Sequence, residues 1–533
     1  MPITTNTLHI PLLTIILLLP SLGAAICWVV PSVRLARLLA PAVAIIDFIL
    51  SAFVLVEFHL TGSAWEFQLA DRRDWIESLP GIAHLGITYW LGVDGVSVFL
   101  VVLTGLMMAI AIAAATFMIT ERLRAFLILM LFLETALFGV FMAINLFLFF
   151  VFWEAMLIPS YFLLGVWGEG RRFYATMKFL VYTIFGSFLM LVGIFYLWSR
   201  TGTLDMAGPS GLVAHPLDPT AQTWVFLAFT LAFAIKLPLF PLHSWAPDAY
   251  SESPVPFLIA LAGIMSKAGA FGFIRYCVAL FPTAAHNFQA LISILAIIGM
   301  LYAAGLALVQ TDIKRLVAYS SISHMNLIVL GIFALNATGI DGSVLQMINH
   351  SVIISGLFLA VAYITARTGT RLLPQMGGLG RRWPLLMWLF FVFVLAGLDL
   401  PGLGSFSGEF LILLGVFREN AWYASIAAVT VILAAWYMIR FFQDSMNGPE
   451  KEPIEPAAEP AADAGSVYQF PVFQRLIRGD LLPGEILLYV PLVLLILYLG
   501  VKPVTVTRRV DPTVARLVTL VRSAPSPGLG GGP

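Results

Sequence analysis

The chain has 533 residues, of which 60% are hydrophobic and only 11% are charged, and its mean hydropathy is +0.95. Soluble globular proteins are about 45–50% apolar and about 25% charged. The composition therefore excludes a soluble multidomain enzyme, a nucleic-acid-binding protein and a disordered protein, and it indicates a polytopic membrane protein. Since 29 basic and 29 acidic side chains cancel, no net charge favours nucleic acid or an acidic substrate.

The sequence carries no motif for a redox cofactor or a metal ion. Its two cysteines, Cys27 and Cys277, are far apart and lack C-x-x-C spacing, so we interpret them as small apolar residues. The glycines at 402–408 miss the G-x-G-x-x-G spacing, and there is no P-loop and no C-x-x-C-H haem motif. We therefore expect no cofactor and no metal in this chain.

In chain order, the first apolar run at 8–30 lacks early basic residues and is expected to be a membrane helix, not a cleaved leader. A spanning helix needs about 20 apolar residues. By that measure the sequence predicts an all-α fold of about fourteen transmembrane helices. Thirteen of them are centred near residues 18, 48, 107, 134, 155, 187, 231, 268, 298, 326, 355, 431 and 492, and one further span, at 386–417, is interrupted. The acidic, Pro/Ala-rich segment Gly448–Gly465 is expected to be a solvated linker.

Basic residues predict the orientation, because cytoplasmic connections are enriched in lysine and arginine. One set of alternate connections carries 17 of them: Arg34, Arg37, Arg122, Arg124, Arg171, Arg172, Lys178, Lys314, Arg315, Arg367, Arg371, Arg381, Arg382, Arg440, Lys451, Arg475 and Arg478. The opposite connections carry only Arg72, Arg73, Arg200, Arg275 and Arg418. Both termini are therefore expected on the non-cytoplasmic side. With five basic residues in the C-terminal tail, only Lys236 and Lys267 remain, and both fall inside predicted spans.

Ionisable residues inside predicted spans are functional candidates, because a charged side chain in hydrocarbon is costly unless it faces a partner or a wet cavity. The candidates are Glu134, Glu154, Lys236, Lys267, His324, His350, Asp399 and Glu409. Acids, amines and imidazoles at this depth are typical of a proton relay. Glu134 and Glu154 flank a predicted turn at Asn145 and are expected at similar depth, and Pro159 is expected to kink the helix of Glu154.

Two of the predicted spans contain helix breaks. Pro238 and Pro241 stand two and five residues after Lys236 and are expected to interrupt the helical hydrogen bonds. Residues 400–409 form a second break, L-P-G-L-G-S-F-S-G-E. Broken helices at membrane depth line cavities, and a matched pair of them marks the pathway of a transporter.

The spacing of the breaks predicts an internal duplication. Arg124, at the start of the fourth span, precedes Pro238 by 114 residues, and Ala290, at the start of the ninth, precedes Pro401 by 111. Five spans separate equivalent positions of the two repeats. Because each span crosses the membrane once, an odd number reverses the direction of the chain, so the two repeats must be inverted relative to each other. We predict an N-terminal segment at 1–120, five-helix repeats at 121–282 and 286–445, a linker at 446–482 and a last helix with its tail at 483–533.

Structural interpretations remain open for single residues. A buried lysine or glutamate can form a structural ion pair, and Glu134 can reach the membrane surface. His324 and His350 can be core histidines or, less simply, haem ligands. Asp399 can cap the half-helix that follows it.

Several motifs together resemble the antiporter-like membrane subunits of respiratory complex I, NADH:quinone oxidoreductase, and among them the subunit M branch, chain 4 in mitochondria. The resemblance covers about residues 92–442 and rests on F-W-E-A-M-L-I-P-S-Y-F-L (152–163), I-K-L-P-L-F-P-L-H-S-W-A-P-D-A-Y (235–250), G-I-M-S-K-A-G-A-F-G (263–272), D-I-K-R-L-V-A-Y-S-S-I-S-H-M (312–325), Q-M-I-N-H (346–350) and F-S-G-E-F (406–410).

The resemblance implies a role for each candidate. Glu154 and Lys236 match the family's glutamate in the fifth span and lysine in the broken seventh. Lys267 matches the connecting lysine, and His324 and His350 the relay histidines. Glu409 ends the relay where subunit M carries glutamate and its relatives carry lysine. Asp399 departs from the pattern, which has a neutral residue there. The chain also ends about 30 residues after its last predicted span, so the long lateral helix of subunit L is not expected.

The resemblance implies a proton-translocating subunit of a complex I in a bacterial cytoplasmic membrane. Protons are expected to pass from Lys236 through Lys267, His324 and His350 to Glu409, with Glu134 tuning the first pair. FMN, iron–sulfur clusters and quinone are expected in partner subunits, with further antiporter-like subunits beside this chain and no nucleic acid. The alternatives are a sodium/proton antiporter subunit, a ferredoxin- or hydrogenase-linked complex, and an assembly scaffold with vestigial charges.

Overall fold

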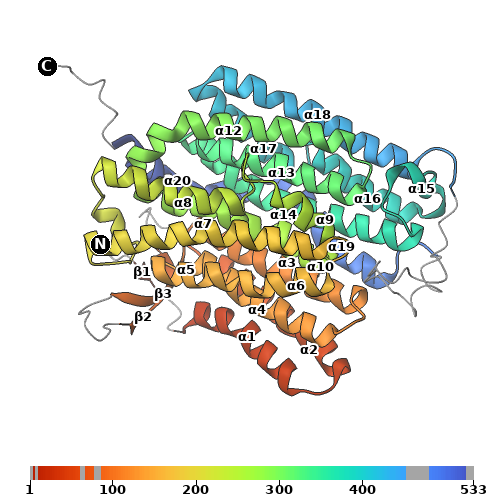
Figure 1. The fold of residues 1–533 in the computed structure, drawn as a ribbon, viewed down its shortest axis with the longest axis horizontal. Coiled ribbons are helices and arrows are strands. Elements are labelled where there is room, and N and C mark those ends of the chain that lie inside the picture. Colours follow the sequence, from red (N-terminus) through yellow and green to blue (C-terminus); the bar gives the residue numbers. More distant parts are fainter. Residues whose placement is uncertain (1–3, 6–9, 60–66, 77–85, 452–478, 524–533) are drawn as a thin grey trace.

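The computed structural model describes residues 4–5, 10–59, 67–76, 86–451 and 479–523, and its fold is almost entirely helical (Figure 1). Within these ranges, twelve helical segments are long and apolar enough to cross a membrane. They are α1 (Leu12–Val29), α2 (Val33–Glu57), α3 (Ser97–Met118), α4 (Leu123–Met142), α5–α6 (Leu146–Ala155 and Leu157–Trp167), α7 (Arg172–Thr201), a composite helix at Val255–Val278, α12 (Pro282–Val309), α13 (Ile313–Ile332), α14 (Ala337–Thr368), α18 (Ala421–Met446) and α19 (Pro483–Val501).

Two further crossings are interrupted, and they are the two that the sequence predicts. The first consists of α8 (Pro219–Lys236) and α9 (Trp245–Glu252), and the second of α16 (Pro384–Gly397) and α17 (Gly404–Glu419). If each interrupted pair crosses the membrane once, the number agrees with the predicted fourteen, and this exact number stays a prediction. Short helical turns complete the chain at Leu212–Ala214 (η1), Leu373–Gln375 (η4) and Leu379–Arg382 (α15).

The helices lie roughly side by side along the long axis of the molecule, with α1 and α2 at one edge and α18 at the opposite edge (Figure 1). The composite helix and α14 lie in the centre, where the apolar windows of both are completely buried. Each predicted repeat has its interrupted crossing in fourth position, so the breaks occupy equivalent places in the two halves. The domain boundaries drawn from the sequence stay predictions.

The composite helix is not uniformly α-helical. It runs through α10 (Val255–Ala260), a π-helical segment η2 (Leu261–Met265), α11 (Ser266–Gly272) and a second π-helical segment η3 (Phe273–Val278). Each π turn widens the helix and rotates the side chains that follow it, and such turns occur mostly at functional sites. The central helix is therefore specialised at the two turns that flank α11.

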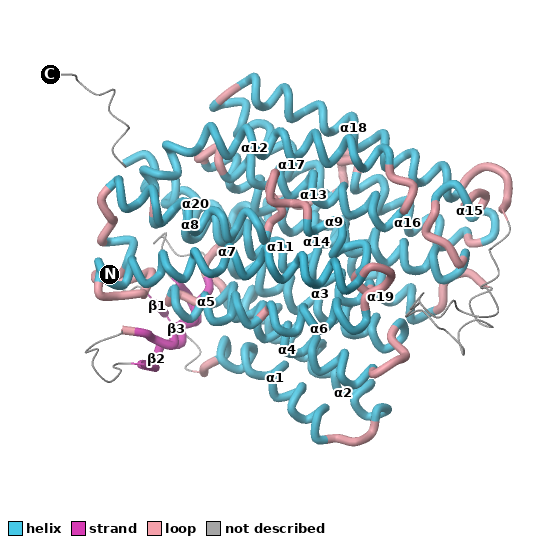
Figure 2. The backbone as a smooth tube through the Cα atoms, in the orientation of Figure 1, coloured by secondary structure: helices cyan, strands magenta, loops and turns pink. Residues whose placement is uncertain are grey.

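Two elements were not expected from the sequence. A small sheet of β1 (Thr4–Thr5), β2 (Phe67–Ile76) and β3 (Ile87–Val93) lies at one end of the helices (Figure 2). After the last span, α20 (Val504–Ser523) is an amphipathic helix that packs on α14 and α12. Its buried face consists of Val506, Val510, Val514, Leu517, Val518 and Val521. The apolar period of α20 is visible in the sequence, but the segment was interpreted only as a C-terminal tail.

One basic residue was assigned wrongly from the sequence. Arg275 was placed in a connection, but it lies in η3 inside the composite helix, and its side chain is only 6% exposed. Its guanidinium forms an ion pair with Asp94 at 2.8 Å between Nη2 and Oδ1, which makes its burial tolerable. Most of the predicted linker, residues 452–478, lies outside the described residues.

Candidate functional site

The first helix break places Lys236 at the last residue of α8. Pro238 has no N–H to continue the helix, so carbonyl groups at this end need other donors. The indole Nε1 of Trp245 donates to the carbonyl of Ile235 at 2.8 Å, and Asn326 Nδ2 on α13 donates to the carbonyl of Pro238 at 3.2 Å. The predicted break is confirmed, and side chains of α9 and α13 stabilise it.

Lys236 is buried, with an exposed fraction of 4%. Its Nζ lies 5.3 Å from the ring centroid of Trp153 and 5.8 Å from that of Phe179. Glu154 acts on Lys236 electrostatically, but among the described residues no ion pair of 4.0 Å or less joins them. As predicted, the helix of Glu154 is interrupted before Pro159, since α5 ends at Ala155. The carboxylate and the ammonium are therefore neighbours that do not touch in this state.

Lys267 lies in α11 between the two π turns and is completely buried. Its Nζ donates to the carbonyl of Ala262 at 2.8 Å and contacts the hydroxyl of Ser266 at 3.4 Å. The third contact is His350 Nδ1 on α14, at 2.7 Å from Nζ. When Nζ donates to Nδ1, a neutral His350 carries its proton on Nε2, which has no hydrogen-bond partner among the described residues.

Lys267 and His350 begin a row of buried titratable side chains, called the line below. The next member is His324 on α13, whose ring centroid lies 5.7 Å from that of His350. His324 in turn lies next to two carboxyl groups, because single ligand atoms of His324, Asp399 and Glu409 all lie within 4.8 Å of one another. The spatial order is therefore Lys267, His350, His324 and then the two acids. The order expected from the sequence, with His324 before His350, is wrong, because α14 and not α13 faces Lys267 directly.

The second break is shorter than predicted. It spans residues 398–403, and the segment from Gly404 to Glu419, including Glu409, already belongs to α17. Helix α14 stabilises it: Asn349 Nδ2 donates to the carbonyl of Gly404 at 2.6 Å, and Gln346 Nε2 donates to Ser405 Oγ at 2.8 Å. A side chain of α13 thus donates to a backbone carbonyl at the first break, and side chains of α14 donate to a carbonyl and a hydroxyl at the second. Irregular backbone at membrane depth requires such hydrogen-bond partners.

Asp399 does not cap the following half-helix. The N-cap of α17 is Leu403, which makes no side-chain hydrogen bond to it. Both carboxyl oxygens of Asp399 are buried and have no donor among the described residues. The capping interpretation is therefore wrong, and the side chain is left to interact with Glu409 and His324.

Glu134 belongs to a different cluster from the line. It is completely buried, so it does not reach the membrane surface, and its electrostatic partner is Asp47 on α2. Neither carboxyl group has a hydrogen-bond donor among the described residues. Sequence reasoning missed Asp47, although a single aspartate within the 25-residue apolar helix α2 is the pattern that identified the other candidates.

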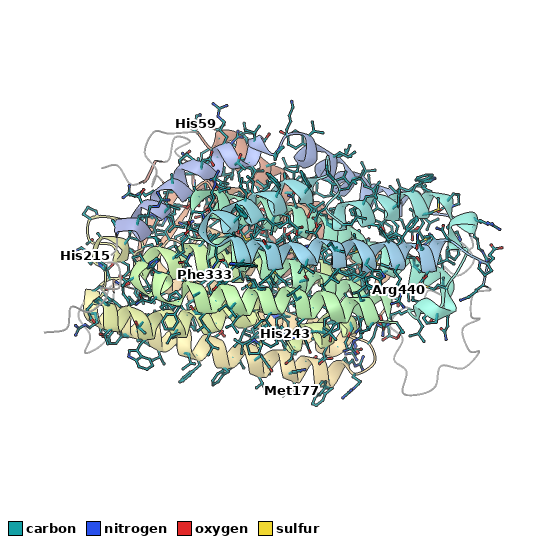
Figure 3. All side chains as sticks on the ribbon, turned by 90° about the horizontal axis from the view of Figure 1, so that it is seen from above. His59, Met177, His215, His243, Phe333 and Arg440 are labelled. Carbon is teal, nitrogen blue, oxygen red and sulfur yellow. The ribbon has the colours of Figure 1, made fainter. Side chains whose placement is uncertain are left out.

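A network of charged residues at the end opposite the sheet was also missed. Glu169, which precedes α7, forms ion pairs with Lys314 at 3.5 Å and with Arg371 at 3.1 Å. Lys314 also donates to the carbonyl of Ser253, between α9 and α10, at 2.6 Å. The network therefore holds the outer end of the first broken span. Figure 3 shows that His215 and Arg440 lie on opposite sides of the middle along the long axis.

The described residues contain one group of side chains close enough to hold a metal ion, and it is the same His324, Asp399 and Glu409. One imidazole and two carboxylates are a donor set that a transition metal accepts. The cluster also lies at the end of the line of titratable groups and beside a helix break, so its position fits proton transfer equally well.

Comparison with known proteins gives the family. Residues 143–434 match the family model described as "NADH:quinone oxidoreductase/Mrp antiporter, TM". The chain belongs to this family. NADH-quinone oxidoreductase subunit M of Rhodobacter capsulatus is 36% identical over 529 residues, covering 95% of this chain and 96% of that protein. Subunit M of Rickettsia prowazekii is 34% identical over 503 residues, covering 94% and 96%. The resemblance found in the sequence is confirmed.

Solved structures agree. A chain of respiratory complex I from Thermus thermophilus with bound NADH superposes with a TM-score of 0.83 and 31% identity, over 96% of this chain and 99% of that one. A chain of the Mrp complex from Dietzia sp. DQ12-45-1b superposes with a TM-score of 0.79 over 96% of this chain and 100% of that one. At 19% identity, the second match shows a shared fold alone.

Proposed function

We propose that this chain is the proton-translocating membrane subunit of an NADH:quinone oxidoreductase. The relatives named above are subunits M of such enzymes and match this chain over nearly their whole length. The single observation that carries the proposal is the line of buried titratable groups between the helix breaks, because Lys267, His350 and His324 follow one another at contact or ring-to-ring distance.

The first step of the mechanism is the separation of Lys236 from Glu154. A buried ammonium is stable only while an opposite charge compensates it. When Glu154 moves away, the Nζ–H bond of Lys236 breaks and the proton passes toward Lys267 through bridging water. In this structure Glu154 acts on Lys236 electrostatically, without an ion pair of 4.0 Å or less.

The second step is transfer along the histidines. A proton that reaches Lys267 Nζ can pass to His350 Nδ1 across 2.7 Å, while His350 releases its proton from Nε2 toward His324. An imidazole suits this task because it accepts a proton at one nitrogen and donates from the other. The proton then reaches the carboxyl groups beside α17 and leaves the chain.

The driving energy comes from partner subunits. The sequence resemblance implies that FMN, iron–sulfur clusters and the quinone site belong to other subunits, with further antiporter-like subunits packed beside this one. We place the complex in a bacterial cytoplasmic membrane with both termini on the non-cytoplasmic side, as the basic residues indicate.

The test is Lys236→Ala in the intact complex, reconstituted in vesicles. NADH oxidation by an artificial acceptor reports assembly of the peripheral subunits, and the pH gradient reports pumping. We expect normal NADH oxidation and loss of pumping. Full pumping at normal assembly would exclude the role of Lys236.

The antiporter alternative is tested in the same vesicles. Electrogenic sodium/proton exchange without NADH or quinone would favour it. Glu409 argues against a sodium/proton antiporter subunit, because the sequence resemblance implies a lysine at the equivalent position of the antiporter relatives.

A further inference from the structure

Asp399 occupies a left-handed backbone position. Its φ is +60°, in the region where glycine is favoured and where aspartate is tolerated because its short side chain can form a local hydrogen bond. Asp399 forms no such bond with the described residues. It lies in the break between α16 and α17, is 7% exposed, and makes no cap. The local backbone therefore gives no reason for a carboxyl group here, and any reason must come from what the carboxyl faces.

It faces a second carboxyl group. Carboxyl oxygens of Asp399 and Glu409 lie within 4.8 Å of each other, and neither oxygen of Asp399 has a hydrogen-bond partner among the described residues. Two buried carboxylates at this distance repel each other, so the pair is stabilised when it binds one proton. The acid that carries this proton can donate it to the other carboxylate, because a carboxylate only accepts. No lysine or arginine among the described residues forms an ion pair with either group, and without a cation two buried carboxylates cannot both stay ionised.

The other titratable groups around the pair come from three helices. His324 of α13 lies within 4.8 Å of both acids. Tyr437 of α18 acts electrostatically on both, and its hydroxyl donates to Ser320 at 3.2 Å. His350 of α14 lies next to His324, at 5.7 Å between ring centroids, and Lys267 contacts the other side chain of this histidine pair, His350. The imidazole of His324 is therefore the member of the line that the structure places within 4.8 Å of both acids.

We propose that Asp399 and Glu409 share one proton and together form the last proton-binding site of the line, with His324 as the donor. In the transfer step, an N–H bond of the His324 imidazolium breaks and a new O–H bond forms on the pair. The net charge of the pair changes from −1 to 0, and the imidazole becomes neutral. Release of one proton from the pair restores the charge of −1. The role of this site in pumping rests on the function proposed above, whereas the shared proton does not.

The test is infrared difference spectroscopy of the purified intact complex during a pH change, in which a protonated carboxyl group gives a carbonyl band and a carboxylate does not. The variants are Asp399→Asn, Asp399→Gly, which suits the positive φ, and Glu409→Gln. The control is Asp341→Asn, since Asp341 is another buried carboxyl group, on α14, but interacts with Asp511 of α20.

We expect Asp399→Asn, Asp399→Gly and Glu409→Gln to remove or shift the same carbonyl band, because one proton serves both acids. The control should leave this band in place. A band lost only in Glu409→Gln would overturn the shared proton. A band absent from the unmodified complex would overturn it too and would indicate a bound cation between ionised carboxylates.

Pumping in vesicles gives the second readout. We expect Asp399→Gly to lose pumping while NADH oxidation by an artificial acceptor is retained. If Lys236→Ala stops pumping but Asp399→Gly pumps normally with an unchanged carbonyl band, this inference fails and the proposed function stands. If Lys236→Ala pumps normally, the proposed function fails and the band still decides whether the proton is shared.

Discussion

The buried ion pair between Arg275 and Asp94 allows a quantitative prediction. Both side chains are less than 10% exposed, and Arg275 Nη2 lies 2.8 Å from Asp94 Oδ1. The same oxygen accepts the backbone N–H groups of Val96 at 3.2 Å and Ser97 at 2.9 Å, at the beginning of α3. Asp94 therefore has two separable functions: it neutralises a buried cation and it caps a helix.

Two substitutions separate these functions. Asp94→Asn keeps an oxygen for the N–H groups but leaves Arg275 buried without a counter-charge, which costs about 3–5 kcal/mol in the free energy of unfolding. Asp94→Ala also removes the cap, which costs about 1 kcal/mol more. In Asp94→Asn/Arg275→Met the unpaired cation is gone, so most of the loss should be recovered. The control is Asp444→Asn, because the Arg440–Asp444 pair is 40% and 49% exposed and is worth at most about 1 kcal/mol.

The assay is thermal unfolding of the chain in detergent micelles with a thiol-reactive fluorescent dye. Cys27 and Cys277 are both buried, so the dye reacts only as the chain unfolds. We expect the unfolding temperature to fall in the order Asp444→Asn, Asp94→Asn, Asp94→Ala, with the double variant close to the unmodified chain. An Asp94→Asn variant as stable as Asp444→Asn, or a double variant less stable than Asp94→Asn, would refute the reasoning.

Two further predictions concern the line and the second break. Glu154→Gln should reduce proton pumping far more than Glu134→Gln, because Glu154 acts on Lys236 and Glu134 acts on Asp47; equal losses in the vesicle assay would contradict this separation. Asn349→Ala should leave the carbonyl of Gly404 without its donor and destabilise the chain by about 1–3 kcal/mol in the same thermal assay, and an unchanged unfolding temperature would show that the contact does not hold the break.

The breaks and most of the line could be predicted from sequence because each depends on local features. Two prolines three residues apart, just after Lys236, disrupt the local helical hydrogen bonds, and a charged residue in an apolar run is conspicuous. What could not be predicted depends on which helix face meets which. The order of His350 and His324 follows from α14 lying next to the Lys267 helix, and the sequence does not state that packing.

Two further features that the sequence did not predict, the ion pair of Arg275 and the π turns, also depend on how the helices pack. The partner of Arg275 is Asp94, on a different element far away in the sequence, so Arg275 looked like a residue of a connection. The π turns beside Lys267 leave no mark in the sequence pattern, because both segments are buried on all sides and have no exposed face to set a period. Asp47 could have been found by the rule that was applied to the other candidates.

The central claim is that protons cross this chain along Lys267, His350 and His324. The most direct measurement is the number of protons pumped per NADH oxidised in vesicles containing the complex with His350→Leu. This change removes the group that contacts Lys267 at 2.7 Å and leaves Lys236 and Glu154 intact. We expect fewer protons pumped per NADH oxidised, or none, with normal NADH oxidation by an artificial acceptor. An unchanged ratio at an unchanged rate would contradict it.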